Sequence, residues 1–487
     1  MEQSGPVQAG DASTSNVPLG PTLILSGGTG YNDLVSATLP SPTTYVLPIS
    51  DNGGSSSEII RCFGGPSIGD IRSRLVRLIP SEVTSNGDAT GTGGNEALRN
   101  LLSYRFPVDN SEDEILDEWK EVIAGTHHIW EGVDEVRGSI VRGFITHFHK
   151  AVLATFSKPF PSSDPLCSSA AEPFDLHGLS IGNAFLSSCA RTFDSLQAAI
   201  WLFCNVARID TKQVRAIPCV ETTETSHIAA RLENGQLLLG QCEISHPAKK
   251  REGDATPAVL EPKKATNGLL TAVESLSLSD PITKMLRPVI SRTNSNLVFS
   301  KAAGKNALPS RIQSIHYAFP SIDAAEGQLR PQALSANPAY LAALQKTETL
   351  IYSCGSLYTS IVPLLVLQGV GVAIAHSKTI RRKVLLLNTQ LDRETGGYDA
   401  LDFIRAITHA CSSSSPTDHE DCAEVQPRQL MSHLVYHPKG QVAVDVEQVE
   451  ELGISCVRIP DRPGKVAFTE EDVRYALHVI MKAQSEG

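Results

Sequence analysis

The stretch Thr22-Leu23-Ile24-Leu25-Ser26-Gly27-Gly28-Thr29-Gly30 decides the fold class of this chain. Its short apolar run has the length of a buried strand, and a glycine cluster follows at once. A second apolar run, Thr44 to Ile49, ends in Asp51-Asn52-Gly53-Gly54-Ser55-Ser56-Ser57. Short β-like runs that end in glycine clusters and lead into helical patterns are typical of βα units. The sequence therefore predicts an α/β fold with a mostly parallel sheet and helices on both faces.

The same rhythm recurs further along the chain. Asn234-Gly235, between two apolar runs, predicts a hairpin of strands 228–232 and 236–239. Apolar runs predict further strands at 349–352, 383–387, 434–436 and 456–459. Apolar residues at helical spacing predict helices at 131–156, 181–190, 195–207, 357–367, 399–410, 446–452 and 470–482.

Composition restricts the class of protein. The chain has 487 residues, with 42 Lys and Arg and 53 Asp and Glu, so its formal net charge is 42 − 53 = −11. This acidic balance argues against a general nucleic-acid binder, although it does not exclude a local basic cleft. Ten cysteines without any Cys-x-x-Cys indicate reduced thiols, not a disulfide frame or a zinc site. No apolar run reaches the ~20 residues of a membrane span, and the N-terminus lacks the features of a signal peptide. We expect a cytoplasmic protein that does not bind a membrane.

The first glycine cluster, Gly27-Gly28-Thr29-Gly30, suits the approach of phosphate oxygens to backbone N–H groups at a helix start. It lacks the G-x-G-x-x-G spacing of a dinucleotide site, which makes an NAD-dependent oxidoreductase a weak alternative, and no Walker P-loop follows. A tight turn without a ligand is the competing interpretation.

Acidic residues accompany two of the Gly-rich turns. Asp51 follows a strand, and Asp70 follows the turn in Gly64-Gly65-Pro66-Ser67-Ile68-Gly69-Asp70-Ile71-Arg72-Ser73-Arg74. Asp at such positions can bind a divalent metal or accept a hydroxyl proton, and Arg72 and Arg74 could pair with phosphate. Alternatively, both acids only cap helix N-termini and the arginines are solvated.

Two further polar turns lie between a strand and a helix or at a helix start. The first turn is Ser353-Cys354-Gly355-Ser356-Leu357-Tyr358-Thr359-Ser360, and it offers hydroxyl and N–H groups to a phosphate or a sugar. The second turn is Ser180-Ile181-Gly182-Asn183, in which the Asn183 side-chain amide could bind a ligand or cap a helix.

These motifs, in their order along the chain and together with Asn388-Thr389-Gln390 and Thr395-Gly396-Gly397-Tyr398, closely resemble the CofD-like family. That family includes the 2-phospho-L-lactate transferases and the YvcK-type gluconeogenesis factors, and the Gly-Gly-Pro turn and the insertions look most like its plant and fungal branch. Asn52 stands where bacterial members have a second acid.

The resemblance implies a Rossmann-like, three-layer domain over residues 21–485, after a disordered tail at 1–20. Flexible insertions are expected at about 81–94, 157–173, 246–304 and 412–424.

The resemblance also implies a transferase that moves a phospholactate-type group from a nucleotide donor to an acceptor hydroxyl with Mg²⁺. The alternative is a non-catalytic regulator that binds a UDP-sugar. In either case the partner is a nucleoside diphosphate or a nucleotide sugar, and a homo-oligomer stays open. Asp51 and Asp70 are the implied catalytic acids and metal ligands. The implied nucleotide-binding residues are Gly27, Gly28, Thr29, Gly30, Asn52, Gly53, Gly54, Ser55, Gly69, Arg72, Asn183, Gly355, Ser356, Tyr358 and Thr359.

Overall fold

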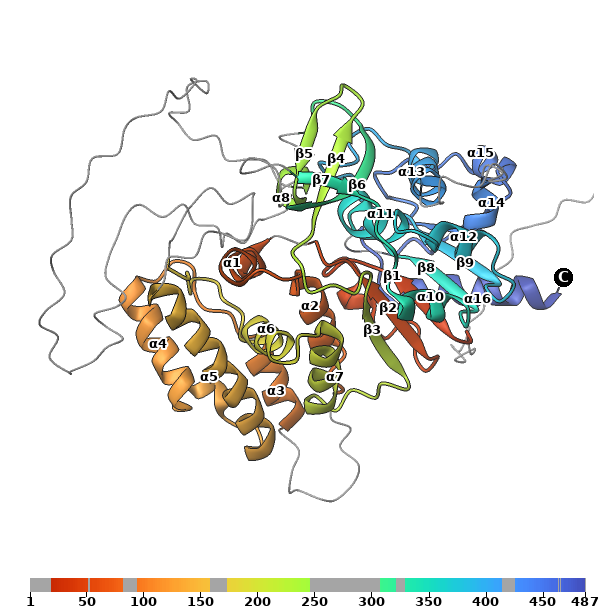
Figure 1. Ribbon diagram of the computed structural model, residues 1–487. Helices are drawn as coiled ribbons and strands as arrows, with labels where there is room; N and C mark the ends of the chain where they lie inside the picture. The colour runs from red at the N-terminus through yellow and green to blue at the C-terminus, as the bar shows by residue number, and fades with distance from the viewer. Residues whose placement is uncertain are drawn as a thin grey trace, which may run out of the picture.

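Seven parallel strands form the central sheet of the protein (Figure 1). The computed structural model describes residues 19–50, 53–81, 94–157, 173–245, 307–320, 329–413, 425–462, 464 and 466–486. In spatial order the strands are β11 (Ser455–Arg458), β10 (His433–Tyr436), β9 (Arg382–Leu386), β8 (Thr349–Tyr352), β1 (Thr22–Leu25), β2 (Thr43–Leu47) and β3 (Val214–Pro218). The predicted α/β class with a mostly parallel sheet is confirmed.

The chain leaves β1 toward β2 and β3, and later returns through β8 to β9, β10 and β11 on the opposite side. The strand order therefore reverses between β1 and β8. In open α/β sheets the crevice at the carboxyl ends of the strands, at such a switch point, is where ligands bind.

A second, four-stranded antiparallel sheet lies near the carboxyl ends of the central strands (Figure 1). Its order is β5 (Leu237–Leu239), β4 (His227–Leu232), β6 (Ile312–Pro320) and β7 (Leu329–Gln332). The sequence predicted the β4–β5 hairpin but not β6 and β7; β6 pairs with β4 across a long chain separation.

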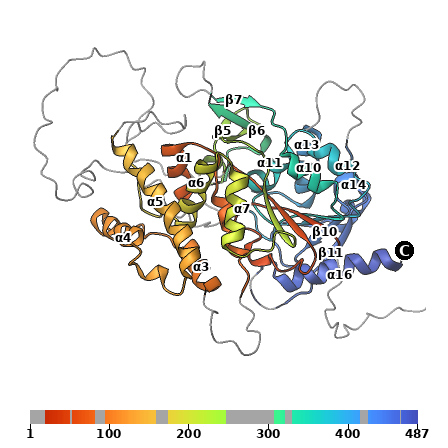
Figure 2. The same ribbon diagram turned by 60° about the horizontal axis from the view of Figure 1, so that its bottom comes forward.

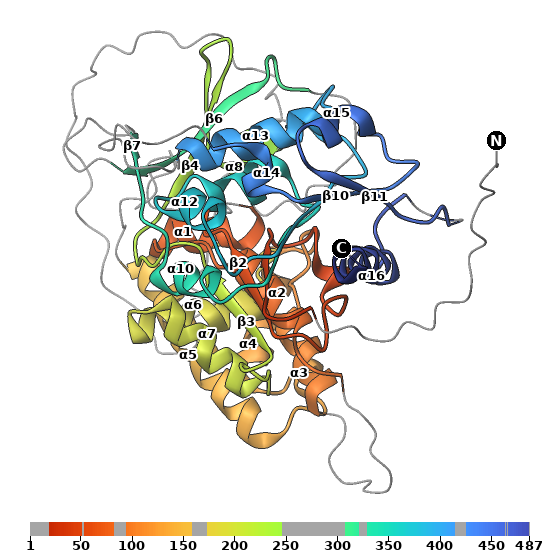
Figure 3. The same cartoon turned by 90° about the vertical axis from the view of Figure 1, so that its right-hand side faces the viewer.

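Helices cover both faces of the central sheet (Figures 1 and 3). One face carries α10 (Pro338–Leu344), α11 (Val362–Leu365), α12 (Val370–Ala375), α13 (Ala400–Ser413) and α14 (Pro427–Leu430). The other face carries α2 (Gly69–Arg77) and the C-terminal α16 (Glu470–Glu486), which Figure 2 shows below the strands. The remaining short elements are η1 (Asn32–Leu34), α1 (Gly54–Phe63), α8 (Gln241–Ser245), the π-helical turn η3 (Leu357–Ile361) and α15 (Val446–Glu451).

A group of helices extends from the β3 side of the sheet (Figure 1). It comprises α3 (Gly94–Ser103), α4 (Glu112–Ala124), η2 (His128–Trp130), α5 (Glu135–Ser157), α6 (Ile181–Phe193) and α7 (Leu196–Val206). The amphipathic pattern of 131–156 is realised as α5, which begins at Glu135, and the patterns of 181–190 and 195–207 as α6 and α7.

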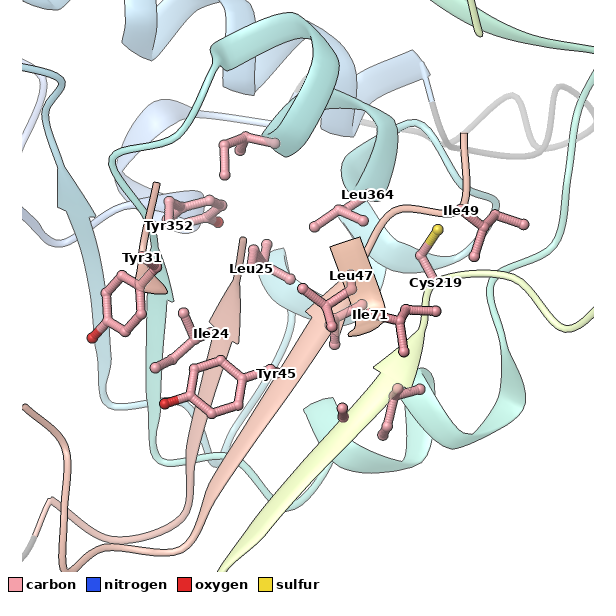
Figure 4. Close-up of a cluster of buried hydrophobic side chains, with 14 of the residues drawn as sticks. Ile24, Leu25, Tyr31, Tyr45, Leu47, Ile49, Ile71, Cys219, Tyr352 and Leu364 are labelled. Atoms are coloured by element: carbon pink, nitrogen blue, oxygen red, sulfur yellow. The ribbon is translucent and has the colours of Figure 1, made fainter. Parts of the chain in front are cut away.

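The core lies on both faces of the central strands. Figure 4 shows Tyr352 and Leu364 near Leu25 on one side, whereas Ile24 and Tyr45 lie on the other. The alternation of side chains along each strand produces this division, and because both faces are covered, every residue of β1 and β8 is buried.

Some expectations need correction or lie outside the described residues. Order begins by Leu19, because its side chain is buried and its carbonyl accepts hydrogen bonds from Thr349 and Arg382, so the predicted tail at 1–20 extends too far. Most of each predicted insertion, and residues 1–18, lie outside the described part of the chain. The predicted helix 357–367 is the π turn η3 followed by the short α11.

Arg74 on α2 anchors the chain that leaves β1. Its side chain is fully buried, and its guanidinium donates to the carbonyl of Tyr31 at 3.0 Å, to Ser26 Oγ at 3.1 Å and to the carbonyl of Gly27 at 3.3 Å. The guanidinium carbon also lies 4.7 Å from the centroid of the Tyr45 ring. The prediction that Arg74 pairs with phosphate is therefore wrong, because these protein groups already engage its charge.

We expect Arg74→Ala to lower the free energy of unfolding by about 3 kcal/mol or more, because it leaves a cavity and buried acceptors without their donor. Arg77→Ala, on the same helix, is the matched control. Its side chain is 55% exposed, and the loss should stay within about 0.5 kcal/mol. Urea denaturation of both variants measures the difference; equal stabilities would contradict the anchoring role.

Candidate functional site

The Gly-rich loop after β1 and the loop after β8 meet at the switch point of the sheet. A Cβ atom on Gly30 would lie 2.8 Å from Cα of Gly355, and the Cys354 thiol lies 3.5 Å from the carbonyl oxygen of Gly30. The two predicted loops are thus brought into direct backbone contact, which leaves no room for a side chain at Gly30. Asn388, in the loop after β9, donates to the carbonyl of Gly355 at 3.0 Å and holds the second loop from its other side.

Backbone N–H groups without acceptors gather in this crevice. Within the described part of the chain, the N–H groups of Gly27–Gly30 and of 354–356 donate no hydrogen bond. Gly27, Gly28 and Gly355 are buried, and buried N–H groups nearly always have an acceptor in a finished structure. Buried Ser353 Oγ, at the end of β8, likewise has no partner among the described residues. The crevice can therefore accept a ligand rich in oxygen acceptors.

Asp70 stands directly beside Gly28. A Cβ on Gly28 would lie 2.0 Å from Asp70 Oδ1 and 3.0 Å from Asp70 Cα. The alternative that Asp70 caps α2 is wrong, because the N-cap of this helix is Ile68. Asp51 and Asn52 lie outside the described residues, so their predicted roles stay predictions. Asp70 is the acid that the described structure places at the Gly-rich loop.

A divalent cation fits the donor chemistry at Asp70. Mg²⁺ is commonly held by one or two carboxylates together with substrate phosphates and water. Within the described residues no group of three or more His, Cys, Asp or Glu side chains could hold a metal ion by itself. A cation here would therefore depend on the ligand's oxygens as well as on Asp70.

A hydrogen-bonded chain joins the starts of α1, α2 and α6. Arg72 Nε donates to Asn183 Oδ1 at 3.0 Å, and Asn183 Nδ2 donates to Ser55 Oγ at 2.9 Å. Arg105, which the sequence did not single out, reaches the same hydroxyl at 3.4 Å and the carbonyl of Gly178 at 2.8 Å. Asn183 does not cap α6, because Ser180 is the N-cap and Asn183 is the third residue of the helix. These predicted ligand residues thus position one another. Gly53 and Gly54, at the start of α1, and Gly69, at the start of α2, lie at the same helix ends.

Tyr358 and Thr359 form a second network around Glu394. The Tyr358 N–H donates to Glu394 Oε2 at 2.8 Å, and Thr359 Oγ1 donates to Oε1 at 2.6 Å. Ser245 Oγ also donates to Glu394 Oε1. The Tyr358 hydroxyl lies 3.0 Å from that of Tyr398. The side chains of Tyr358 and Thr359 are therefore committed to this network, while the neighbouring Ser360 lies against Gly27.

Glu394 was missed in the sequence. Its position in the sequence could have indicated a role, because Glu394 lies between two motifs of the family, Asn388-Thr389-Gln390 and Thr395-Gly396-Gly397-Tyr398. Only 3% of its surface is exposed. Burial, and then the charge of Asp392, raises the pKa of its carboxyl to about 7.

The raised pKa makes stability depend on pH. Because the folded-state pKa lies above the unfolded value, the stabilising contribution is fully present below about pH 4.5 and is lost as the pH rises through about 7. We expect wild type to lose roughly 2–3 kcal/mol relative to Glu394→Gln between pH 5 and pH 8. Urea denaturation at both pH values measures this. Glu447→Gln on exposed α15 is the control, and parallel pH profiles for wild type and Glu394→Gln would contradict the assignment.

A protein family and several known proteins resemble this chain, some of them over most of its length. The family model described as 2-phospho-L-lactate transferase CofD matches residues 22–460. The uncharacterized protein YNL011C of Saccharomyces cerevisiae is 31% identical over 456 residues, which cover 90% of this chain and 94% of the yeast protein. A gluconeogenesis factor of Halalkalibacterium halodurans is 30% identical over 118 residues, 24% of this chain and 36% of that protein.

A solved structure supports the fold. The crystal structure of a UPF0052 family protein from Bacillus halodurans superposes with a TM-score of 0.52 at 17% identity, covering 94% of this chain and 98% of that one. In the described residues no helix is both long and apolar enough to span a membrane. The extent of the family match, over the residues that build the switch-point crevice, shows that this chain belongs to the CofD family.

Proposed function

We propose that the protein binds the diphosphate of a nucleotide-linked ligand in the crevice between β1 and β8. The observation that supports this most strongly is the set of N–H groups in Gly27–Gly30 and 354–356 without acceptors among the described residues. Successive N–H groups that face one space form an anion-binding site, and a diphosphate offers many acceptor oxygens to them.

The starts of α1 and α2 strengthen this proposal. The N–H of Ser67, just before α2, donates at 2.9 Å to the carbonyl of Ile49, two residues beyond β2, so α2 begins at the same sheet edge as the crevice. The N-terminus of a helix carries a partial positive charge and favours a nearby anion. Neither α1 nor α2 has a side-chain cap, which leaves its first N–H groups to other acceptors.

We propose further that the bound nucleotide donates a phosphoryl-linked group to an acceptor hydroxyl. The hydroxyl oxygen would form a bond to phosphorus as the P–O–P bond of the diphosphate breaks, so that a nucleoside monophosphate leaves and the hydroxyl proton is released. Asp70 would hold a divalent cation against the ligand's oxygens, together with Asp51 if that side chain reaches the same space. When bound, the cation supplies charge neutralisation at the diphosphate. The chain of Arg72, Asn183 and Ser55 would keep the helix starts rigid beside the ligand, and Arg72 adds a cation near the anion.

The second candidate function is a regulator that binds a nucleotide sugar without turnover. Relatives named gluconeogenesis factor favour it, such as the one in Halalkalibacterium halodurans. A labelled nucleotide donor separates the two: turnover supports the transferase, and saturable binding without turnover supports the regulator.

Gly28→Ala tests the crevice with the smallest side chain. The added Cβ would meet Asp70 Oδ1 at 2.0 Å, so either Asp70 or the Gly-rich loop must move. We expect nucleotide affinity to fall at least tenfold, about 1.4 kcal/mol, while the protein stays folded. Isothermal titration with GDP and UDP in the presence of Mg²⁺ measures it. Gly143→Ala, where a Cβ meets nothing within 4 Å, is the control. Unchanged affinity in Gly28→Ala would refute the site.

Asp70→Asn tests the cation separately from the crevice. Asn keeps the size of the side chain but is a poorer magnesium ligand, because it lacks the negative charge. Nucleotide binding by wild type should strengthen with added Mg²⁺, and this dependence should disappear in Asp70→Asn. Exposed Asp113→Asn on α4 should behave as wild type. If binding by wild type is indifferent to chelator, the cation is not part of the site, although the nucleotide proposal would survive.

A further inference from the structure

A second cavity, of about 490 Å³, lies between β6 and α13. It is a different place from the Gly-rich crevice, because none of the residues of Gly27–Gly30 or 353–356 lines it. Figures 1 and 3 show β6 and α13 in neighbouring positions on the side of the small sheet. Its volume falls within the range of about 300–1,000 Å³ that small-molecule sites occupy.

One wall of the cavity is a single face of α13. The residues that line it are Asp402, Arg405, Ala406, His409, Ala410 and Ser413, spaced three or four apart. Together they span roughly 16 Å along the helix axis. The opposite wall is the first half of β6. Along this half, one edge of β6 pairs with β4. On the other edge, the described β7 residues pair only with Tyr317–Pro320, in the second half of β6. The cavity therefore follows a part of β6 that β7 does not cover.

The floor of the cavity is apolar and aromatic. Val362 and Val366, from α11 and the residue after it, lie there with Leu334, and the Tyr358 and Tyr398 rings stand nearly perpendicular to each other at 6.2 Å between centroids. Apolar and aromatic walls with a few polar groups are typical of sites that take a planar organic ring.

Charged groups divide the cavity into two ends. At one end Arg311 donates to Asp402 Oδ1 at 3.0 Å and lies over the Tyr398 ring, and Glu233 is also near it. The two carboxylates, Asp402 and Glu233, carry one formal negative charge more than Arg311 neutralises, and Arg405 supplies the second positive charge. Arg405 shares the already engaged Asp402 at 3.3 Å, and its side chain is 70% exposed.

Donor groups continue along α13 toward the other end. His409 follows Arg405 by one helical turn and lies near His316 of β6, whose Nε2 is 2.9 Å from Ser314 Oγ. Arg231, on the neighbouring strand β4, lies near His316 but does not line the cavity. Arg405 has more N–H groups than its pair with Asp402 uses, so Arg405 and His409 can donate hydrogen bonds to an anion. The cavity thus combines an aromatic floor with hydrogen-bond donors toward this end.

We propose that this cavity is a second ligand site, which takes a small amphipathic organic anion with an aromatic body. The ring would lie on the floor of Tyr358, Tyr398 and Val362, and the acidic group would lie at Arg405 and His409. The proposal does not rest on nucleotide binding in the crevice. The π turn η3 separates the two places, since Tyr358 lines the cavity and Ser360 contacts Gly27.

The experiment uses anilinonaphthalene sulfonate, a fluorescent aromatic anion, and phenyl-naphthylamine, which has the same rings without the sulfonate. Titration of the full-length protein should show saturable binding of the sulfonate dye that is about tenfold tighter than that of the neutral dye. Arg405→Gln should remove this difference and leave the neutral dye unaffected. Arg215→Gln, on an exposed position of β3, is the matched control and should change neither titration.

Ala406→Trp fills the cavity and should weaken both dyes at least tenfold, with circular dichroism showing that the variant is folded. If both dyes bind Ala406→Trp as they bind wild type, the fluorescence reports adventitious binding only and the proposal is overturned. It is also overturned if saturating GDP or UDP with Mg²⁺ displaces the sulfonate dye, or if Gly28→Ala loses it, because the cavity would then be part of the nucleotide site. Dye binding that persists when no nucleotide binds would refute the proposed function alone.

Discussion

The buried guanidinium of Arg74 is the constraint on which the rest of the site depends. It holds the carbonyls of Tyr31 and Gly27 and the hydroxyl of Ser26, so it fixes the chain on both sides of the Gly-rich loop. Asp70 precedes Arg74 by one turn of α2 and therefore lies on the same face of the helix. Because Arg74 is fixed in place, the position of Asp70 beside Gly28 is fixed as well. Burial lowers the pKa of the Arg74 guanidinium, but the group keeps its charge.

Two hydrogen-bond networks support the crevice from opposite sides. Arg72, Asn183 and Ser55 connect the helix starts on the β2 side, and Glu394 connects η3 to α8 and to the loop after β9. Both networks use side chains that sequence reasoning assigned to the ligand. Polar residues in a Gly-rich motif can thus hold the backbone of the loops in place instead of contacting a ligand themselves.

The local patterns predicted the strands of the switch point well. β1 and β8 agree with the predicted runs, since buried parallel strands read as short continuous apolar segments. β3 and β6 escaped prediction because their pairing partners are distant in sequence and their own patterns are weak. Glu394 was not predicted because a single Glu in a loop carries no local sign of burial. Whether a carboxylate is buried depends on which other segments of the chain pack over it.

The sequence by itself determined the α/β class, the Gly-rich loops at strand ends and the membership of a family, because these follow from apolar periodicity, glycine placement and motif order. Tertiary structure alone decided that Arg74 faces protein carbonyls instead of phosphate, that Asp70 stands over Gly28 and that α13 borders a second cavity. The physical reason is that a side chain's role depends on its desolvation and its partners. Both are set by segments that are far apart in the chain and that only the folded sheet brings together.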